Sequence, residues 1–322
     1  MNEYGDWAQI EQLFQSSLER PQGERRAYIR STAKSHKSAE IALQLLKAHE
    51  HSTSFMSTSL GLATPEPSYQ MGDIIGNWQV ERIIGSGGMG EVYLVNRTGA
   101  DFNQTAALKL IRIDNPIYEK RFHKERQLLA SMEHAGIGRL IDGGQGPDGR
   151  QYMVVEYIMG APITEYADHH SLKIEELLRL FINLAEALAY AHRQQILHRD
   201  IKLANVLVTQ EGTVKLIDFG VAHILNIDEQ SVAPVTIAYA APEQLQGRPV
   251  SVATDIYGLG LLLYELVTKT RFGADETPDI KNLERDLRAI IDKCLQPHPQ
   301  DRFHSTECLI KDIENLLGSV DN

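Results

Sequence analysis

The sequence predicts an α+β protein in which a small strand-rich lobe precedes a larger helical lobe, with a short helical unit ahead of both. Three observations support this architecture. Apolar residues recur at helical spacing in the first fifty residues, β-branched runs separated by turns follow residue 73, and long amphipathic runs dominate after residue 159. A chain of 322 residues has room for about two domains.

Composition excludes some classes of function. The chain has 32 lysine and arginine residues against 43 aspartate and glutamate residues, which gives a formal net charge of −11. Such an acidic protein has no excess of basic side chains to displace the counterions of a nucleic acid, so we expect no nucleic-acid partner. Its two cysteines, Cys294 and Cys308, are too few for a disulfide framework and favour a reducing compartment.

Two further features bear on localisation. The first seven residues are acidic and polar, unlike a secretory leader. The most apolar run, Ile256 to Leu263, is far shorter than the roughly 20 residues that a membrane-spanning helix needs. We therefore expect a cytoplasmic protein without a membrane span.

Residues 1–50 are predicted to form a small helical appendage. Trp7, Ile10, Phe14 and Leu18 fall on one face of a helix. This face predicts a partner surface, either on the larger domain or on another copy of the chain. Residues 51–72 are rich in serine and threonine and are predicted to be a linker, because they cannot bury enough surface to offset the entropy of ordering.

Residues 73–158 are predicted to form the strand-rich lobe. Trp78–Ile84, Glu91–Val95 and Thr105–Ile113 have strand patterns. Glu119–Met132 is predicted to be a helix, and Arg150–Tyr157 another strand.

A glycine-rich run from Gly85 to Gly90 fits the pattern G-x-G-x-x-G. With 24 glycines in the chain the pattern alone is weak, and its bland interpretation is a flexible hairpin tip. A dinucleotide-binding loop would open into a helix, whereas here the strand Glu91–Val95 follows. The context favours a turn between two strands whose backbone N–H groups cover phosphates.

Lys109 lies within the apolar strand Thr105–Ile113, where its ammonium group needs an anionic partner. A nucleotide phosphate together with a helix carboxylate would supply one. Glu125 is the candidate carboxylate and Glu119 the alternative, while a solvated strand face is the bland interpretation of the lysine.

The segment from His198 to Asn205 reads His-Arg-Asp-Ile-Lys-Leu-Ala-Asn and precedes two short strands, the second of which ends at Asp218. A tight hairpin brings its two ends together, so Asn205 and Asp218 are expected to converge near Asp200. An amide oxygen and a carboxylate beside phosphates suit Mg²⁺. Asp200 is then free to accept a proton from a hydroxyl group.

The order of these motifs, completed by Ala241-Pro242-Glu243, resembles the bacterial members of the Hanks-type serine/threonine protein kinases. The resemblance spans residues 73–318 and implies the two-lobed protein-kinase fold, with a β-rich N-lobe at 73–158 and a helical C-lobe at 159–318. It implies transfer of the γ-phosphate of MgATP to serine or threonine hydroxyls of proteins, the chain itself included. Lys202, two residues after the catalytic aspartate, is typical of serine/threonine kinases.

The resemblance also implies a role for each matched residue. Asp200 would be the catalytic base, and Lys202 would steady the transferring phosphate. Lys109, held by Glu125, would grip the α- and β-phosphates, while Asn205 and Asp218 would hold Mg²⁺. The residues that would surround ATP are Ile84, Gly85, Ser86, Gly87, Gly88, Met89, Gly90, Val92, Ala107, Lys109, Val155, Glu156, Ile158 and Leu207.

Other matched residues would support the site. Asp255 would brace the catalytic loop from a buried helix. Glu243 would pair with Arg302, which lies almost sixty residues further along the chain.

Activation is the last property that the resemblance implies. Thr236 would contact Asp200. Arg199 would bind a phosphate on the segment that precedes Ala241, and Ser231 is the preferred position for it. The alternative is that this short segment is ordered without a phosphate.

Two other functions stay open at this point. A nucleotide-binding scaffold without activity, a pseudokinase, is disfavoured because every ionic residue of the site is present. A small-molecule kinase of related fold is disfavoured by Ala-Pro-Glu at 241–243. Only 46 residues separate Asp255 from Arg302, fewer than the kinases that the chain resembles usually have. Residues 268–278 are therefore expected to replace a longer platform for docking protein substrates, and the sequence does not specify the substrate.

Overall fold

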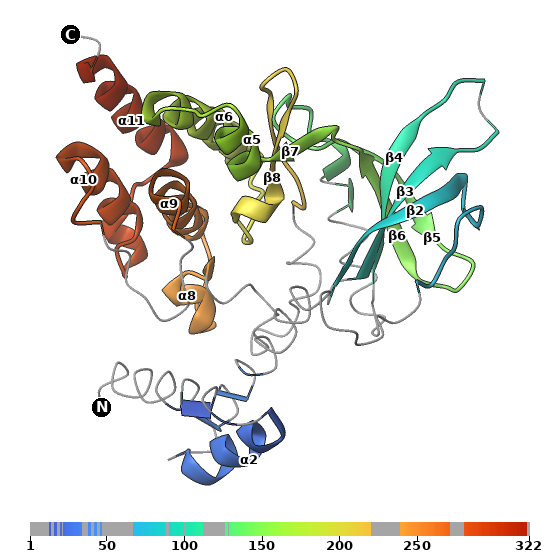
Figure 1. The fold of residues 1–322 in the computed structure, drawn as a ribbon, viewed down its shortest axis with the longest axis horizontal. Coiled ribbons are helices and arrows are strands. Elements are labelled where there is room, and N and C mark those ends of the chain that lie inside the picture. The colour runs from blue at the N-terminus through green and yellow to red at the C-terminus, as the bar shows by residue number, and fades with distance from the viewer. Residues whose placement is uncertain are drawn as a thin grey trace. The chain divides into compact units, whose positions relative to one another are not determined.

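The structure, a computed structural model, divides the chain into an N-terminal unit and a larger unit (Figure 1). Each unit is considered by itself. The larger unit is described at residues 67–87, 90–99, 101–111, 126–127, 129–219, 239–270 and 280–320, and the N-terminal unit at residues 13, 16–17, 20, 22–33, 38–39, 42–43 and 46.

The N-terminal unit is helical through most of its described residues. Helix α2 (Gln22–Thr32) is its longest described element, and the buried side chains of Leu13, Ile29, Ala42 and Leu46 form its core. The four residues of the predicted apolar stripe lie outside the described residues.

The larger unit begins with an antiparallel sheet of six strands in the order β1-β2-β3-β4-β6-β5. The predicted strands are present, and the sequence did not indicate β1 or β5. The strands are β1 (Ile74–Ile75), β2 (Trp78–Gly87), β3 (Gly90–Arg97), β4 (Thr105–Ile111), β5 (Leu140–Gln145) and β6 (Gln151–Glu156).

The two faces of this sheet have different partners. Val92 lies opposite Lys109 across β3 and β4, and Glu91 lies opposite Leu110. Because successive side chains alternate between faces, Val92 and Lys109 share one face and Glu91 and Leu110 the other. The face of Leu110 carries an apolar core that includes Tyr93.

The rest of the larger unit is mostly helical and begins with a small sheet in the order β7-β8-β9. Its strands are β7 (Gly160–Pro162), β8 (Val206–Thr209) and β9 (Val214–Leu216). The helices are α5 (Ile163–His169), α6 (Ile174–Arg193), α8 (Pro242–Leu245), α9 (Val252–Thr268), α10 (Arg285–Cys294) and α11 (Thr306–Val320), with 3₁₀ turns at Leu203–Asn205 and Pro299–Asp301.

Helix α9 is the centre of the helical lobe. It packs against α6 and α10, and most of its residues are buried, as its nearly uniform apolar sequence predicts (Figure 1). Ser251 caps its first turn: the side chain accepts a hydrogen bond from the Ala253 N–H at 3.3 Å. Gly258 lets the helix approach Ile201 closely, since a Cβ there would lie 2.9 Å from the Ile201 Cβ.

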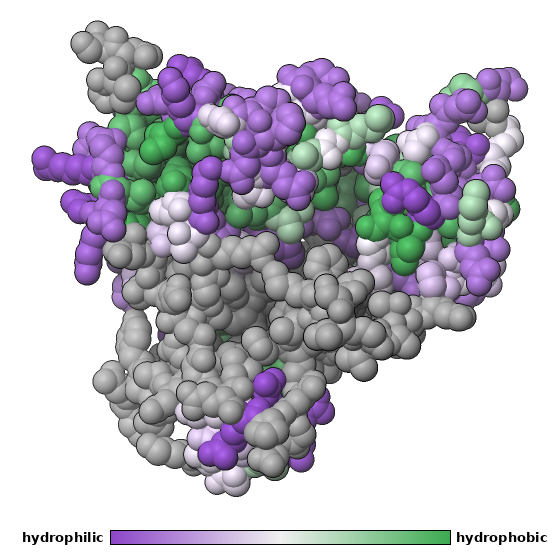
Figure 2. Space-filling view, viewed as in Figure 1, coloured by the Kyte–Doolittle hydropathy of each residue, from purple (hydrophilic) through white to green (hydrophobic). Residues whose placement is uncertain are grey.

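Figure 2 shows hydrophilic residues along the outer ends of the helical lobe, with hydrophobic residues between them. Within the described part of the chain, every helix is too short or too polar to cross a bilayer.

Candidate active site

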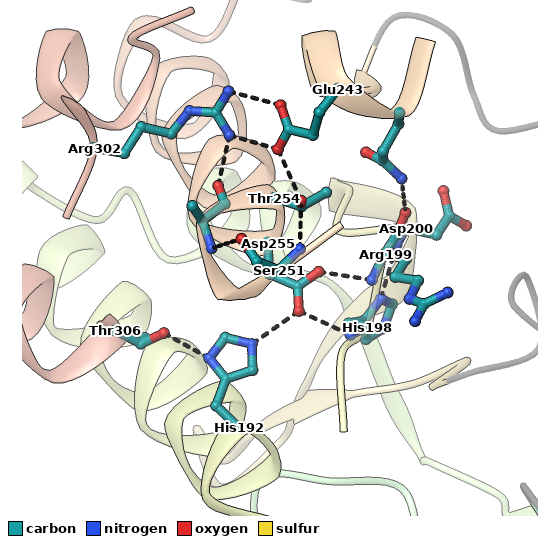
Figure 3. Close-up of polar contacts among 12 residues, drawn as sticks. His192, His198, Arg199, Asp200, Glu243, Ser251, Thr254, Asp255, Arg302 and Thr306 are labelled. Carbon is teal, nitrogen blue, oxygen red and sulfur yellow. Dashed lines mark hydrogen bonds and ion pairs between the residues drawn. The ribbon is translucent and has the colours of Figure 1, made fainter. Parts of the chain in front are cut away.

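The catalytic loop, residues 196–205, joins α6 to β8 and rests on the first turn of α9. The backbone N–H groups of His198 and Arg199 donate to Asp255 Oδ2 and Oδ1, at 2.8 and 2.7 Å (Figure 3). Arg199 has a φ of 65°, a left-handed conformation that non-glycine residues seldom adopt. The two hydrogen bonds to one buried carboxylate hold the loop in that conformation.

Asp255 is itself held from the opposite side by His192 of α6. His192 Nε2 lies 2.8 Å from Asp255 Oδ2, and His192 Nδ1 lies 2.9 Å from Thr306 Oγ1 (Figure 3). Burial alone would raise the pKa of the Asp255 carboxyl, but the hydrogen bonds and positive charge around it, those of His192 first, lower the pKa below its ordinary value. The carboxylate is therefore ionised and fully engaged.

Asp200 is buried at the centre of the loop and retains one free oxygen. Its Oδ2 accepts hydrogen bonds from Lys202 Nζ at 2.7 Å and from Asn205 Nδ2 at 3.3 Å. Its Oδ1 has no hydrogen-bond partner among the described residues. The predicted role of Asp200 as a base would use this oxygen.

His198 connects the catalytic loop to the segment around Asp218. The Asp200 N–H donates to His198 Nδ1 at 3.3 Å, and His198 Nε2 lies 3.1 Å from the Ile217 carbonyl oxygen. These bonds assign the proton of the ring to Nε2. The ring also meets Phe219 edge-to-face at 4.7 Å, so the two motifs share one packed contact.

The predicted hairpin brings Asn205 and Asp218 together. The Ile217 N–H donates to the Asn205 carbonyl oxygen at 2.9 Å, and the Asn205 side-chain nitrogen donates to the Asp200 carbonyl oxygen at 2.8 Å. Because the nitrogen of Asn205 is used within the loop, the amide oxygen is the atom that would bind a metal ion.

Lys109 reaches across from the sheet to Asp218, with Nζ 3.0 Å from Oδ1. Desolvation would raise the pKa of the Asp218 carboxyl, but the charge and hydrogen bond of Lys109 and the charges of His198 and Lys202 together lower the pKa below its ordinary value. An ionised carboxylate and an amide oxygen are the donors that Mg²⁺ prefers, so these residues fit that ion.

Glu243 and Arg302 form the predicted ion pair below the loop. Arg302 Nη1 and Nη2 donate to Glu243 Oε1 and Oε2 at 2.8 and 2.9 Å, and Thr254 Oγ1 also donates to Oε1 at 2.8 Å. Arg302 Nε donates to the Gln296 carbonyl oxygen at 2.7 Å. Burial would raise the pKa of Glu243, but these donors lower it below its ordinary value. The pair is buried and its hydrogen bonds are satisfied, as a buried charge pair requires.

The residues expected around ATP lie on β2, β3, β4, β6 and β8. Ile84, Gly85, Ser86 and Gly87 lie in β2, and Gly90 and Val92 lie in β3. Ala107 lies opposite Val155, Glu156 ends β6, Ile158 follows it and is buried, and Leu207 lies in β8. A Cβ at Gly90, whose φ is 136°, would collide with the Leu110 carbonyl oxygen, so this position requires glycine.

Some predicted site residues cannot be placed. Glu125, Gly88, Met89, Ser231 and Thr236 lie outside the described residues, as does the alternative carboxylate Glu119.

The sequence did not indicate His192 and Thr306, which support the loop indirectly: His192 contacts Asp255, and Thr306 contacts His192. A lone histidine on an apolar helix face, such as His192, carries no signal of its contact with Asp255. The same holds for Thr306, 114 residues away from His192. The Ser251-x-x-Thr254 capping pattern did carry a signal, because it marks the start of α9 beside Asp255.

A buried proton acceptor, a lysine–aspartate pair and a glycine-rich hairpin on a curled sheet above a helical lobe define the protein-kinase fold. The sequence matches the protein kinase domain family over residues 78–312. The chain belongs to this family.

Relatives and solved structures agree. The serine/threonine-protein kinase PrkC of Bacillus subtilis is 32% identical over 270 residues, which cover 76% of this chain and 41% of that protein. A probable serine/threonine-protein kinase of Streptomyces coelicolor is 33% identical and covers 75% of this chain and 40% of that protein. The chain thus spans about two-fifths of the length of these curated relatives.

The crystal structure of the Mycobacterium tuberculosis PknI kinase domain superposes with a TM-score of 0.64 and 27% identity. The match covers 77% of this chain and 99% of that domain. These comparisons confirm the predicted fold and the resemblance to bacterial serine/threonine kinases.

Proposed function

We propose that the chain is an active serine/threonine protein kinase that transfers the γ-phosphate of MgATP to hydroxyl groups of proteins, itself included. The observation that carries the proposal is the free Oδ1 of buried Asp200, whose other oxygen is engaged by Lys202 and Asn205. A carboxylate held in this way presents one oxygen at a fixed position, where it can accept a proton.

Each residue has a part in this reaction. Asp200 Oδ1 accepts the proton of the attacking hydroxyl, and Lys202, which already lies against Asp200, neutralises charge on the transferring group. Lys109 binds the α- and β-phosphates, and Glu125 is proposed to hold it there. Asn205 and Asp218 would hold Mg²⁺, which would neutralise negative charge on the phosphates during the transfer.

Substrate class follows from the same residues. Lys202, two residues after the base, favours serine and threonine over tyrosine as acceptors. Protein substrates fit the named activity of the relatives. A pseudokinase is disfavoured, because Lys109, Asp200 and Asp218 are all present, with Lys109 lying against Asp218 and Lys202 against Asp200.

The predicted organisation of the chain is proposed as well. Residues 1–50 form a helical appendage that self-associates or contacts the kinase domain, 51–72 connect it, and 73–318 form the kinase domain. We propose a cytoplasmic location and a phosphorylated state of the protein. For the linker, the structure adds that residues 67–72 already hydrogen-bond to the sheet.

Activation by a phosphate on Ser231 is a further part of the proposal. It is supported by the sequence position of Ser231 and by Arg199, whose backbone is fixed on Asp255. A Ser231→Ala protein, treated with phosphatase and incubated again with MgATP, is expected to stay less active than the wild type. Full recovery of activity would leave the kinase regulated elsewhere.

The proposed function is tested on the full chain. Incubated with labelled MgATP and a basic protein, it is expected to place phosphate on serine and threonine, as detected by mass spectrometry. Chelation of Mg²⁺ or the Asp200→Asn substitution should remove this signal. An unlabelled wild-type reaction, or undiminished labelling by Asp200→Asn, would contradict the proposal.

A further inference from the structure

Glu91 is a buried acidic side chain that the proposed reaction does not use. It directly follows Gly90, the last glycine of the glycine-rich hairpin, and is 3% exposed. Its register opposite Leu110 places it on the face of the sheet away from Lys109. A buried carboxylate needs partners, and those of Glu91 reveal a contact that the sequence did not indicate.

The first partners come from the sheet itself. Tyr93 Oη donates to Glu91 Oε2 at 3.0 Å, and Arg150 Nη1 lies 3.6 Å from the same oxygen. Asp148 Oδ2 binds the Arg150 guanidinium at 2.6 Å and so fixes its position. Burial would raise the pKa of Glu91, but hydrogen bonds from Ser68 and Tyr93 and the charge of Arg150 lower it. Glu91 is therefore ionised, and its second oxygen, Oε1, needs a hydrogen-bond donor as well.

The remaining donor comes from residues 67–70, here called the docking segment, which precedes the sheet. The Ser68 N–H donates to Glu91 Oε1 at 3.4 Å, and the Tyr69 N–H donates to Tyr93 Oη at 3.2 Å. The Tyr69 ring meets the Tyr93 ring edge-to-face at 6.1 Å and lies 5.9 Å from the Arg150 guanidinium carbon. The segment is thus fastened by its backbone to two side chains of β3.

The contact between the docking segment and Glu91 lies close to the glycine-rich hairpin and can therefore affect its position. Glu91 pairs with Ser86 on β2 and with Leu110 on β4, and only Gly90 separates it from the turn. If the docking segment leaves, Glu91 loses a main-chain donor inside an apolar core, and β3 must shift to recover one. Such a shift moves the turn that covers the phosphates.

We propose that Tyr69 and Glu91 are positioning residues for ATP. Through Glu91, the docking segment fixes the position of the start of β3, and β3 in turn fixes the position of the glycine-rich hairpin relative to the phosphates. This inference rests on the proposed kinase function. It adds a contact by which residues 67–70 act on nucleotide affinity from the face of the sheet away from Lys109.

The test uses Tyr69→Ala in the full chain, with Met71→Ala as matched control because Met71 is 82% exposed and lies in the same stretch. Initial rates with varied ATP and varied peptide separate the two KM values, and thermal unfolding reports stability. Tyr69→Ala removes the ring that packs on Tyr93 and lies near Arg150, and so loosens the docking segment. It is expected to raise the KM for ATP about three- to tenfold, the range of one lost aromatic contact, with the KM for peptide unchanged. Met71→Ala should match the wild type.

Two further variants guard against a simple loss of folding. Tyr69→Phe keeps the ring and the backbone donor and should restore the wild-type KM for ATP. Glu91→Gln keeps the shape but removes the charge that Arg150 faces, and should raise the KM for ATP in the same direction. An unchanged KM for ATP in both Tyr69→Ala and Glu91→Gln would overturn the inference, and so would equal changes in both KM values.

Failure of the proposed function is separable from failure of this inference. Affinity for MgATP is measured by calorimetry with Asp200→Asn and with Asp200→Asn carrying Tyr69→Ala. Weaker binding in the double variant supports the positioning role even if the wild type transfers no phosphate. Equal binding in the two proteins contradicts the positioning role, whatever the wild type catalyses.

Discussion

The catalytic loop and the glycine-rich hairpin face the same proposed substrate but are held by different means. The loop is fixed from below by buried ionic side chains, with Asp255 binding two of its N–H groups and Glu243 bound by Arg302. The hairpin is held by strand pairing and, at the start of β3, by Glu91 and the docking segment.

The difference teaches which part of the site is free to adjust. Removing one member of a buried ion pair is strongly destabilising, so we expect the loop to keep its arrangement as long as the lobe is folded. A hairpin held by backbone hydrogen bonds can move when one contact at its base changes. A fixed catalytic loop combined with an adjustable glycine-rich hairpin suits a reaction in which a nucleotide must enter and leave.

The largest effect is expected for Asp200→Asn, which tests the base directly. The substitution keeps the shape and the contacts of Oδ2 but removes the proton acceptor, so kcat should fall about 10³-fold or more. Steady-state rates measure the loss, and the exposed Asp101→Asn serves as control. If kcat survives in a folded Asp200→Asn protein, the acceptor lies elsewhere.

The fixed character of the loop is tested by Arg302→Met. Glu243 would remain buried without its ionic partner, and we expect a loss of about 3–5 kcal/mol in the free energy of unfolding. In a unit of this size the melting temperature should fall by about 10 °C. The exposed Arg285→Met is the matched control. An unchanged melting temperature would show that this pair does not hold the lobe.

Two glycines of the hairpin should respond unequally. Gly90→Ala places a Cβ against the Leu110 carbonyl oxygen in a left-handed conformation, and we expect a cost of about 1–3 kcal/mol together with weaker ATP binding. At Gly85 a Cβ would lie 3.7 Å from the Val92 Cβ, an ordinary contact, so Gly85→Ala should leave stability nearly unchanged. Chemical denaturation and ATP titration compare the two, and equal losses would contradict the strain argument.

The smallest expected effect is the loss of stability at low pH that follows from protonation of Glu243. The pKa of Glu243 is lowered in the folded protein from its ordinary value of 4.5, so the folded state binds this proton less readily than the unfolded state. Its contribution to stability is complete above pH 4.5 and is lost as the pH falls through the folded pKa. The difference in melting temperature between wild type and Glu243→Gln should therefore be largest near pH 7 and shrink below pH 4.5. A difference that grows in acid would reverse the sign of this argument.

The chemistry-bearing residues were predictable because their order along the chain is itself informative. A glycine run followed by a strand excluded a dinucleotide site, and a hairpin between Asn205 and Asp218 required that they meet near Asp200. The sheet was predicted less completely: β5 reads Leu-Ile-Asp-Gly-Gly-Gln, and its glycines and aspartate conceal a strand that is stabilised by its partner β6.

Contacts between distant segments were not predictable from local pattern. The sequence around His192 gives no signal of its hydrogen bond to Asp255, because a helix face that is otherwise apolar predicts only that the histidine is buried. The docking segment has the serine and proline content of a linker, yet its backbone donors are used by Glu91 and Tyr93. In both cases the stabilising partner lies at least 23 residues away in sequence.

The ion pair between Glu243 and Arg302 also has a consequence for folding during synthesis, because its two members emerge from the ribosome at different times. A ribosome delivers the chain from its N-terminus, and domains fold as their residues emerge. The helix that carries Asp255 cannot be fastened to Glu243 through Arg302 until 59 further residues have followed Glu243. A nascent chain that already displays the glycine hairpin and Asp200 still lacks the hydrogen bonds of Arg302 to Glu243 and to the Ala253 carbonyl oxygen at the start of α9. We therefore expect the proposed phosphoryl transfer to reach its full rate only after residue 302 has left the ribosome.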